Sequence, residues 1–325
     1  MKPLVSVVLP CYNESQYIED CLNSLTHQTY KNIEIILIDD KSTDDSIAKA
    51  KKFKIKIYKM KKKGFHGGTR QKGVDLAKGS IIVQTEADAH YPKDFIEKIT
   101  KPIREGKADA TAISLIKPHK RIKGILADFW EIKRLASHEL KKRGRYEIKG
   151  AIAMKKSVVE RVGGYKIKTI GEDVDLANRM KQKGYKIVPV FNTYFYHADP
   201  SNWSEFLRRV YYAGDKGTGK TEFHKKWDRN YQKKEAIAIS LNLLFFISLI
   251  SLATYPIYGW FSLIPFALSF IIEGIIPLLF YKQYKIMPWL ALKKKKLKLF
   301  FLLPLIMYFY TRFNILGRSS RFFRI

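Results

Sequence analysis

Three pairs of acidic residues are candidates for chemistry, and one of them, Glu86 and Asp88, has the acid-x-acid spacing that can hold a metal. Asp39 and Asp40 follow the apolar run 33–38, Glu86 and Asp88 follow the run 80–85, and Glu172-Asp173 follows a glycine. Side chains alternate along an extended chain, so two acids separated by one residue can point the same way. Carboxylate oxygens are the ligands that Mg²⁺ and Mn²⁺ prefer. The sequence therefore predicts a site for one of these ions, suited to a diphosphate group.

The elements that must position these acids alternate between strand and helix patterns. Short apolar runs predict strands at 5–9, 33–38, 55–58, 80–85 and 109–116. Helical spacing predicts helices at 14–27, 44–53, 69–78 (closed by Gly79), from Pro92 onward, and 124–143. This order predicts an α/β fold with a Rossmann-like, mostly parallel sheet covered by helices on both faces. Ligands bind at the carboxyl ends of such strands, which selects the segments after Leu9, Ile38 and Thr85.

The charge balance narrows the classes of partner. Among 325 residues, 60 Lys and Arg against 30 Asp and Glu give a net charge of +30. Such a basic chain binds nucleic acid, an anionic membrane or acidic small molecules, or is simply well solvated. Membrane lipids are favoured and nucleic acid is not expected, because long apolar stretches are also present. Two cysteines, Cys11 and Cys21, give no disulfide framework and indicate a reducing compartment.

The C-terminal region has the pattern of a membrane anchor. Residues 236–256 and 258–280 are each long enough to span a bilayer, with Glu273 as the one charged residue between 236 and 280. Lysines on both sides of this hairpin predict a multi-pass protein of the cell membrane whose catalytic domain is cytoplasmic. A buried pair of core helices is the alternative.

The predicted membrane region, 236–325, contains one further apolar stretch and is preceded by a separate basic region. Residues 299–313 fit either an in-plane helix or a third span. Residues 201–235 are basic and aromatic, which fits interfacial helices on anionic lipid or the acceptor side of an active site.

Taken in order, five motifs resemble glycosyltransferase family 2, nucleotide-sugar enzymes with the GT-A fold. The resemblance covers roughly residues 4–200, which we expect to form the transferase domain. It is carried by the segments Val5–Glu14, Ile38–Asp44, Gly67–Gln71, Val162–Tyr165 and Gly171–Leu176.

The resemblance implies a nucleotide pocket at the ends of the first two strands. Pro10, Tyr12 and Glu14 match the end of the first strand, which lines that pocket in the family. Asp40 matches the acid that hydrogen-bonds the base, with Asp39 beside it. A helix cap is the structural alternative for these acids.

The resemblance also implies residues that bind the donor diphosphate and its metal. Arg70 matches a basic residue near the phosphates, where a guanidinium suits phosphate oxygens. Asp88 matches the last acid of an Asp-x-Asp metal motif, in which Glu86 departs from the family pattern. His197 stands where some GT-A enzymes place a third metal ligand, although a structural histidine is equally consistent.

A catalytic base completes the implied site. Asp173 matches the residue that takes a proton from the acceptor hydroxyl, with Glu172 beside it in the donor site; both acids also fit a helix start. We therefore expect an inverting transferase that uses Mg²⁺ or Mn²⁺ and a UDP- or GDP-sugar.

The predicted membrane anchor indicates which kind of acceptor receives the sugar. A lipid-linked or cell-surface glycan at the cytoplasmic membrane face is expected. A polyprenyl-phosphate sugar synthase is the second hypothesis, and a non-enzymatic basic membrane-binding protein is the alternative from another class. That last class does not explain acids at the ends of strands.

Overall fold

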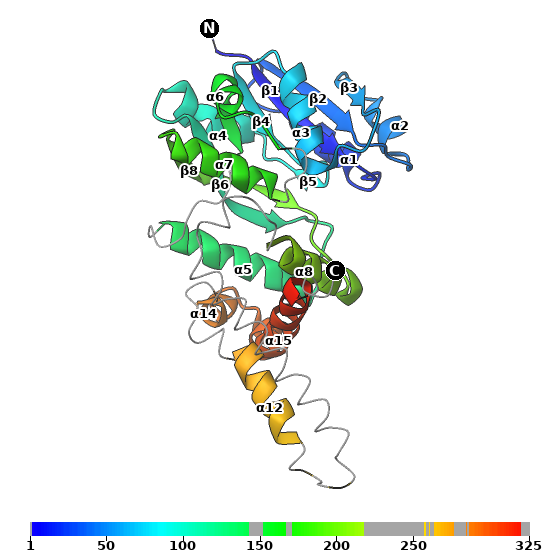
Figure 1. The fold of residues 1–325 in the computed structure, drawn as a ribbon, viewed down its shortest axis with the longest axis vertical. Coiled ribbons are helices and arrows are strands. Elements are labelled where there is room, and N and C mark those ends of the chain that lie inside the picture. The colour runs from blue at the N-terminus through cyan, green and yellow to red at the C-terminus, as the bar shows by residue number, and fades with distance from the viewer. Residues whose placement is uncertain are drawn as a thin grey trace. The chain divides into compact units, whose positions relative to one another are not determined.

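A computed structural model describes residues 2–142, 152–166, 171–217, 263–275 and 286–319, together with 257, 260 and 284 (Figure 1). The chain divides into two compact units. The first comprises Met1–Arg121 and Ser137–Ala198, and the second comprises Ile122–Ala136 and Asp199–Ile325.

The first unit is built on an eight-stranded sheet. Its strands are β1 (Val5–Cys11), β2 (Ile33–Asp39), β3 (Lys56–Lys59), β4 (Ile81–Gln84), β5 (Ala89–His90), β6 (Ala110–Pro118), β7 (Ala153–Lys155) and β8 (Ile187–His197). Their order in the sheet is β3-β2-β1-β4-β7-β6-β8-β5. The four strands β3, β2, β1 and β4 are parallel, as predicted, whereas β7 is antiparallel to both of its neighbours and β5 is antiparallel to β8. The sheet is therefore mixed.

Strand β1 shows why the chain forms a two-faced sheet. All residues of the strand except the half-buried Pro10 are buried, so both faces of the strand are covered. Val5, Val7 and Leu9 join one apolar cluster, while Val8 joins another on the opposite face. These two clusters are the cores between the sheet and its helices.

Helices cover both faces, as expected. Helices α1 (Ile18–Thr26), α2 (Ser46–Ala50) and α4 (Phe95–Arg104) contribute side chains to the first cluster. The second cluster contains side chains of α3 (Phe65–Leu76), α6 (Lys156–Arg161) and α7 (Glu172–Gln182).

Two predicted helix boundaries are wrong. Helix α4 begins at Phe95 and not at Pro92, and α3 runs from Phe65 to Leu76, so Gly79 is not its cap. A Cβ atom on Gly79 would lie 2.5 Å from the Leu4 carbonyl oxygen and 2.8 Å from the Ser6 nitrogen. Glycine is required there because the chain passes directly against the start of β1.

The second unit is helical where it is described. It contains the first part of α5 (Ile125–Lys142), with α8 (Trp203–Gly217), α12 (Ile264–Phe270), the π-helical turn η2 (Ile271–Ile275), α14 (Met287–Lys293) and α15 (Leu297–Ser319). Phe129 of α5, Phe206 of α8 and Leu303 of α15 lie in one buried apolar cluster. The Arg134 guanidinium binds both carboxylate oxygens of the buried Asp199, at 2.5 and 2.7 Å.

The predicted localisation needs correction. Across the described ranges, no helix has both the length and the apolar character that crossing a bilayer requires. The prediction of a multi-pass protein of the cell membrane with a cytoplasmic catalytic domain is therefore wrong. Residues 236–256 lie outside the described residues, as does much of 258–280 and of 201–235.

The stretch predicted as an in-plane helix or a third span is part of α15. Its residues Leu299, Leu303, Ile306 and Met307 are buried in the apolar cluster of the second unit. One face of this apolar helix therefore packs against protein.

Candidate active site

The end of β1 presents an exposed aromatic ring. Pro10 pairs with Ile38 inside the sheet, and Tyr12 follows directly with 43% of its surface exposed. The Lys63 ammonium lies 3.9 Å from the centre of the Tyr12 ring. An exposed ring at the carboxyl end of a parallel strand offers a face on which a planar base can stack.

The two acids at the end of β2 hold backbone groups of the surrounding loops. Asp39 is fully buried, and its Oδ1 accepts a hydrogen bond of 2.8 Å from the Ser42 N–H. Asp40 Oδ1 accepts one of 2.6 Å from the Gly64 N–H. Among the described residues, the second Asp39 oxygen has no hydrogen-bond partner. This orphaned acceptor leaves Asp39 with the capacity to bind a further donor group.

Glu86, Asp88 and His197 form a candidate metal centre. The two acids follow β4, and His197 is the last residue of β8. His197 Nε2 lies 3.3 Å from Glu86 Oε2 and 3.4 Å from Asp88 Oδ2, and one ligand atom from each residue lies within 4.8 Å of the others. Two carboxylates and an imidazole suit Mn²⁺ or Mg²⁺.

Glu14 is a further acid in electrostatic range of this centre. Burial, followed by the charge of Asp88, raises the pKa of Glu14 to about 8, against a smaller opposing effect of His197. The sequence predicts Glu14 as a nucleotide-pocket residue, and the structure brings it within electrostatic range of the metal centre. Such crowding of acids is what a bound cation relieves, so the residues present fit a divalent metal.

Arg70 of α3 connects the metal centre to the acids of α7. Its guanidinium lies 3.8 Å from Glu86 and 3.3 Å from Glu172, and the side chain is only 13% exposed. The Arg70 Nε is buried without a hydrogen-bond partner among the residues that the structure describes. A guanidinium held between acids and still having an unused donor is suited to a phosphate oxygen.

Asp173 lies in the first turn of α7, beside the predicted donor site. Burial raises its pKa, Glu172 raises it further, and Arg70 opposes both. A carboxylate with a raised pKa is a stronger base and so accepts a proton more readily. Gly171 precedes the helix with φ +78°, a left-handed conformation that glycine adopts without strain. Gly171 has no side chain to cap α7, and the Asp173 carboxylate accepts hydrogen bonds from backbone N–H groups at the start of the helix, where the helix dipole also favours both acids.

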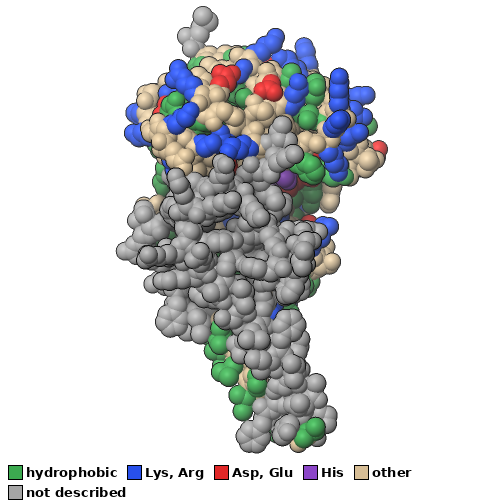
Figure 2. All heavy atoms as spheres, in the orientation of Figure 1, with side chains coloured by type: hydrophobic (Ala, Val, Ile, Leu, Met, Phe, Trp, Pro, Cys, Tyr) green, Lys and Arg blue, Asp and Glu red, His purple; other side chains and the backbone are tan. Residues whose placement is uncertain are grey.

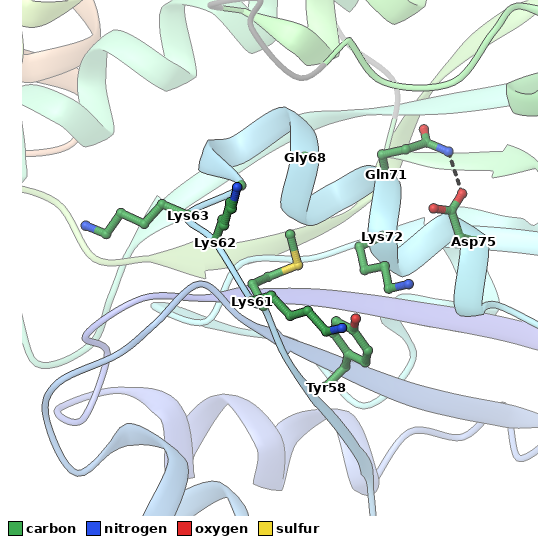
Figure 3. A pocket seen from close by; sticks show the side chains of 10 residues that line it. Tyr58, Lys61, Lys62, Lys63, Gly68, Gln71, Lys72 and Asp75 are labelled. Atoms are coloured by element: carbon green, nitrogen blue, oxygen red, sulfur yellow. Dashed lines mark hydrogen bonds between the residues drawn. The ribbon is translucent and has the colours of Figure 1, made fainter.

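A basic cavity of about 500 Å³ shares a loop with the predicted nucleotide pocket (Figure 3). Figure 3 shows Lys61, Lys62 and Lys63 on that loop and Lys72 on α3, which also carries the hydrogen-bonded pair Gln71–Asp75. Gly64, which donates to Asp40, lies on the cavity wall. The predicted base-binding residues thus lie next to a concentration of positive charge.

Sequence reasoning missed several residues that support the metal centre. Tyr91 is buried, and its hydroxyl accepts a hydrogen bond of 2.8 Å from the Glu86 N–H. Asp20 lies against two histidines, His90 and His119. Asp20 and His119 are far from each other and from His90 in the sequence, so no local pattern indicates that they meet.

The site consists of acids, an arginine and a histidine at the carboxyl ends of strands, as in α/β domains that bind nucleotides. Comparison with known proteins narrows this broad class of nucleotide-binding domains to one family. Residues 6–163 match the family described as "Glycosyl transferase family 2". Residues 6–163 are therefore similar to a glycosyl transferase family 2 domain.

Curated relatives are themselves glycosyltransferases. The chain is 34% identical over 114 residues to the glycosyltransferase GlyG of Streptococcus pneumoniae serotype 4, covering 34% of this chain and 38% of GlyG. It is 28% identical over 199 residues to the amylovoran biosynthesis glycosyltransferase AmsB of Erwinia amylovora, covering 57% of this chain and 66% of AmsB. The chain thus aligns with less than two thirds of either relative.

A solved structure shares the fold. The mannosyltransferase PcManGT from Pyrobaculum calidifontis, solved with GDP-Man and Mn²⁺, superposes with a TM-score of 0.57 at 16% identity. The superposition covers 99% of this chain and 87% of PcManGT. The predicted GT-A-like α/β fold is therefore confirmed, with a mixed sheet in which β7 and β5 run opposite to the other strands.

Proposed function

We propose that the protein is an inverting glycosyltransferase that moves a sugar from a UDP- or GDP-sugar to a lipid-linked or cell-surface glycan. The observation that carries the proposal is the convergence of Glu86, Asp88 and His197 with Arg70, which reaches the acids of α7. The match to family 2 and the named relatives support transfer of a sugar. The GDP-Man and Mn²⁺ of PcManGT support a nucleotide-sugar donor and a divalent metal.

In this proposal residues 1–200 form the transferase domain, and its donor side is built from four regions. The Tyr12 ring stacks on the base, and Asp39 and Asp40 accept hydrogen bonds from it. Arg70 binds a phosphate oxygen, while Glu172 holds the guanidinium in place. Lysines of the neighbouring loop attract the charged donor; Figure 2 shows Lys and Arg side chains spread over the visible face of the first unit.

Glu86, Asp88 and His197 would hold the divalent cation. When bound, the cation neutralises negative charge that develops on the departing diphosphate. In the chain itself, Glu14 lies near Asp88, and burial together with the charge of Asp88 favours the protonated form of Glu14 in the absence of a cation.

Asp173 is the proposed general base. It takes the proton of the acceptor hydroxyl as the hydroxyl oxygen attacks the anomeric carbon. The new glycosidic bond forms on the face opposite the diphosphate, whose bond to that carbon breaks, so the configuration is inverted. The raised pKa of Asp173 makes its carboxylate a better proton acceptor than an ordinary aspartate.

The test is donor turnover by the purified full chain. UDP- and GDP-sugars are screened with Mn²⁺ and with a chelator, and release of the nucleoside diphosphate is measured. We expect metal-dependent release of one nucleotide, reduced by about 10²–10⁴-fold in Asp173→Asn. Glu160→Gln, an exposed acid on α6, is the matched control and should retain full activity. Folded wild-type protein that neither binds nor turns over any donor would overturn the proposal.

A further inference from the structure

The Asp20 carboxylate bridges two histidine rings in the first unit. Asp20 Oδ1 lies 3.2 Å from His90 Nδ1, and Asp20 Oδ2 lies 3.0 Å from His119 Nε2. Asp20 belongs to α1, His90 to β5, and His119 follows β6. One side chain thus joins three elements that are distant in the sequence.

His119 is held in one orientation by both of its ring nitrogens. Its Nδ1 accepts a hydrogen bond from the Arg121 N–H at 3.3 Å, so its Nε2 carries the hydrogen and donates to Asp20. The ring is only 3% exposed and Tyr17 packs against it edge-on, with ring centroids 5.3 Å apart. A buried ring with both nitrogens in use is fixed in position.

The same three residues hold the backbone that carries two of the proposed metal ligands. The His119 N–H donates to the His197 carbonyl oxygen at 2.8 Å. His90 is two residues beyond Asp88, and the Ala198 N–H donates to the Asp88 carbonyl oxygen at 3.0 Å. Asp20 therefore connects to one ligand through His119 and to the other through His90.

Strand β5 needs such support because its own backbone pairing is small. It contains two residues, and it lies at the edge of the sheet with β8 as its one neighbour in the strand order. Two further contacts from α1 hold the same segment. The Tyr91 N–H donates to Ser24 Oγ at 3.1 Å, and the Cys21 thiol lies 3.4 Å from the Glu86 carbonyl oxygen.

We propose that Asp20 is a positioning residue for the metal centre. By holding His90 and His119, it fixes the distance between the strand ends that present Asp88 and His197. The proposal rests on the metal-dependent function proposed above. It makes α1 the support for the segment after β4 that carries Glu86 and Asp88. Residues that orient metal ligands typically contribute about 10–100-fold to metal affinity.

The test measures Mn²⁺ affinity directly, with Mn²⁺ alone as the probe. Full-length protein is titrated with Mn²⁺ without donor, and free Mn²⁺ is followed by electron paramagnetic resonance. We expect Asp20→Asn to raise the Kd by about tenfold or more, because one amide cannot accept from both rings. Glu19→Gln is the matched control: it lies on the same helix, pairs with Lys52 and should bind Mn²⁺ like wild type.

A second pair of variants separates positioning from general destabilisation. His119→Gln places an N–H donor near the original Nε2 and should retain affinity within about threefold, whereas His119→Leu should lose it as Asp20→Asn does. Equal loss in His119→Gln and His119→Leu would overturn the proposal, as would wild-type affinity in a folded Asp20→Asn.

The two proposals fail in distinguishable ways. Binding of Mn²⁺ by wild type, its loss in Asp88→Asn and its retention in Asp20→Asn would overturn the role of Asp20 alone. Absence of Mn²⁺ binding by folded wild-type protein would overturn the metal centre and the role of Asp20 together.

Discussion

The acids at the end of β2 and the acids after β4 have the same charge but different surroundings. Asp39 and Asp40 each accept a hydrogen bond from a backbone N–H, at 2.8 and 2.6 Å. Glu86 and Asp88 lie instead among charged side chains, with Arg70 and His197 within 4 Å and Glu14 in electrostatic range.

The acids at β2 therefore stabilise the surrounding loops, whereas the acids after β4 are arranged to bind a ligand. A carboxylate that accepts from backbone N–H groups contributes to stability in the absence of any ligand. Carboxylates crowded by other acids repel one another until a cation binds. The pair at β2 should therefore matter to folding as well as to binding, and the pair at β4 mainly to function.

The sharpest test of this contrast is Asp88→Asn. The proposed metal supplies several kcal/mol of charge stabilisation, so we expect transfer to fall by about 100-fold or more. The thermal midpoint of the metal-free protein should stay the same or rise, because repulsion from Glu14 is removed. Steady-state rates and melting curves measure the two effects. A large drop in the thermal midpoint with full activity would show that Asp88 serves stability and not function.

The corresponding change at β2 should act on stability. Asp39→Asn weakens a fully buried acceptor that holds the Ser42 N–H, and we expect a loss of about 1–3 kcal/mol in the free energy of unfolding. Urea denaturation measures it. If stability is unchanged while donor affinity falls, Asp39 serves the ligand alone.

The charge around the metal centre should make stability depend on pH. The pKa of Glu14 is raised from 4.5 to about 8, so the folded metal-free protein binds more protons than the unfolded chain between these values. The contribution of Glu14 to the free energy of unfolding is therefore fully present below pH 4.5 and is lost as the pH rises toward 8. Discounted for partial exposure, the loss is about 1–2 kcal/mol.

Unfolding curves at several pH values, with and without Mn²⁺, measure this slope. Glu14→Gln should flatten it, and Mn²⁺ should raise the midpoint more at pH 8 than at pH 6. A slope that persists in Glu14→Gln would assign the effect to another group.

The smallest effect is expected at an acid that serves neither purpose. Asp94 precedes α4 and forms an exposed pair of 2.7 Å with Lys98. Asp94→Asn should change the free energy of unfolding by less than about 0.5 kcal/mol and leave transfer unchanged. A larger change would show that an exposed acid also affects stability or activity. Asp94 could then not serve as the control for the two acidic pairs.

The sequence predicted the parts of the fold that depend on local pattern. Buried parallel strands such as β1 and β2 are continuous apolar runs, and the acids that follow them mark the ligand edge. The short strands β5 and β7 carry too few residues for a period to show. Their existence depends on pairing with β8, β4 and β6, which is set by tertiary structure.

The membrane prediction went wrong for a related reason. Length and hydropathy do not distinguish a membrane helix from a core helix. In α15, which covers the stretch predicted as an in-plane helix or a third span, Leu299 and Leu303 pack in a protein core while Phe301 is exposed. The candidate site shows the same limit. Asp88 and Asp173 could be proposed from motifs, whereas Asp20 and His119 are 99 positions apart and only the folded chain brings them together.

Strand β7 has a consequence for chain direction. It runs against β4, and β6 runs against it, so the two reversals cancel. β6 and β8 then point the same way as β4, although an opposed strand stands between them. The last residue of β8, His197, consequently emerges on the same side of the sheet as the acids after β4.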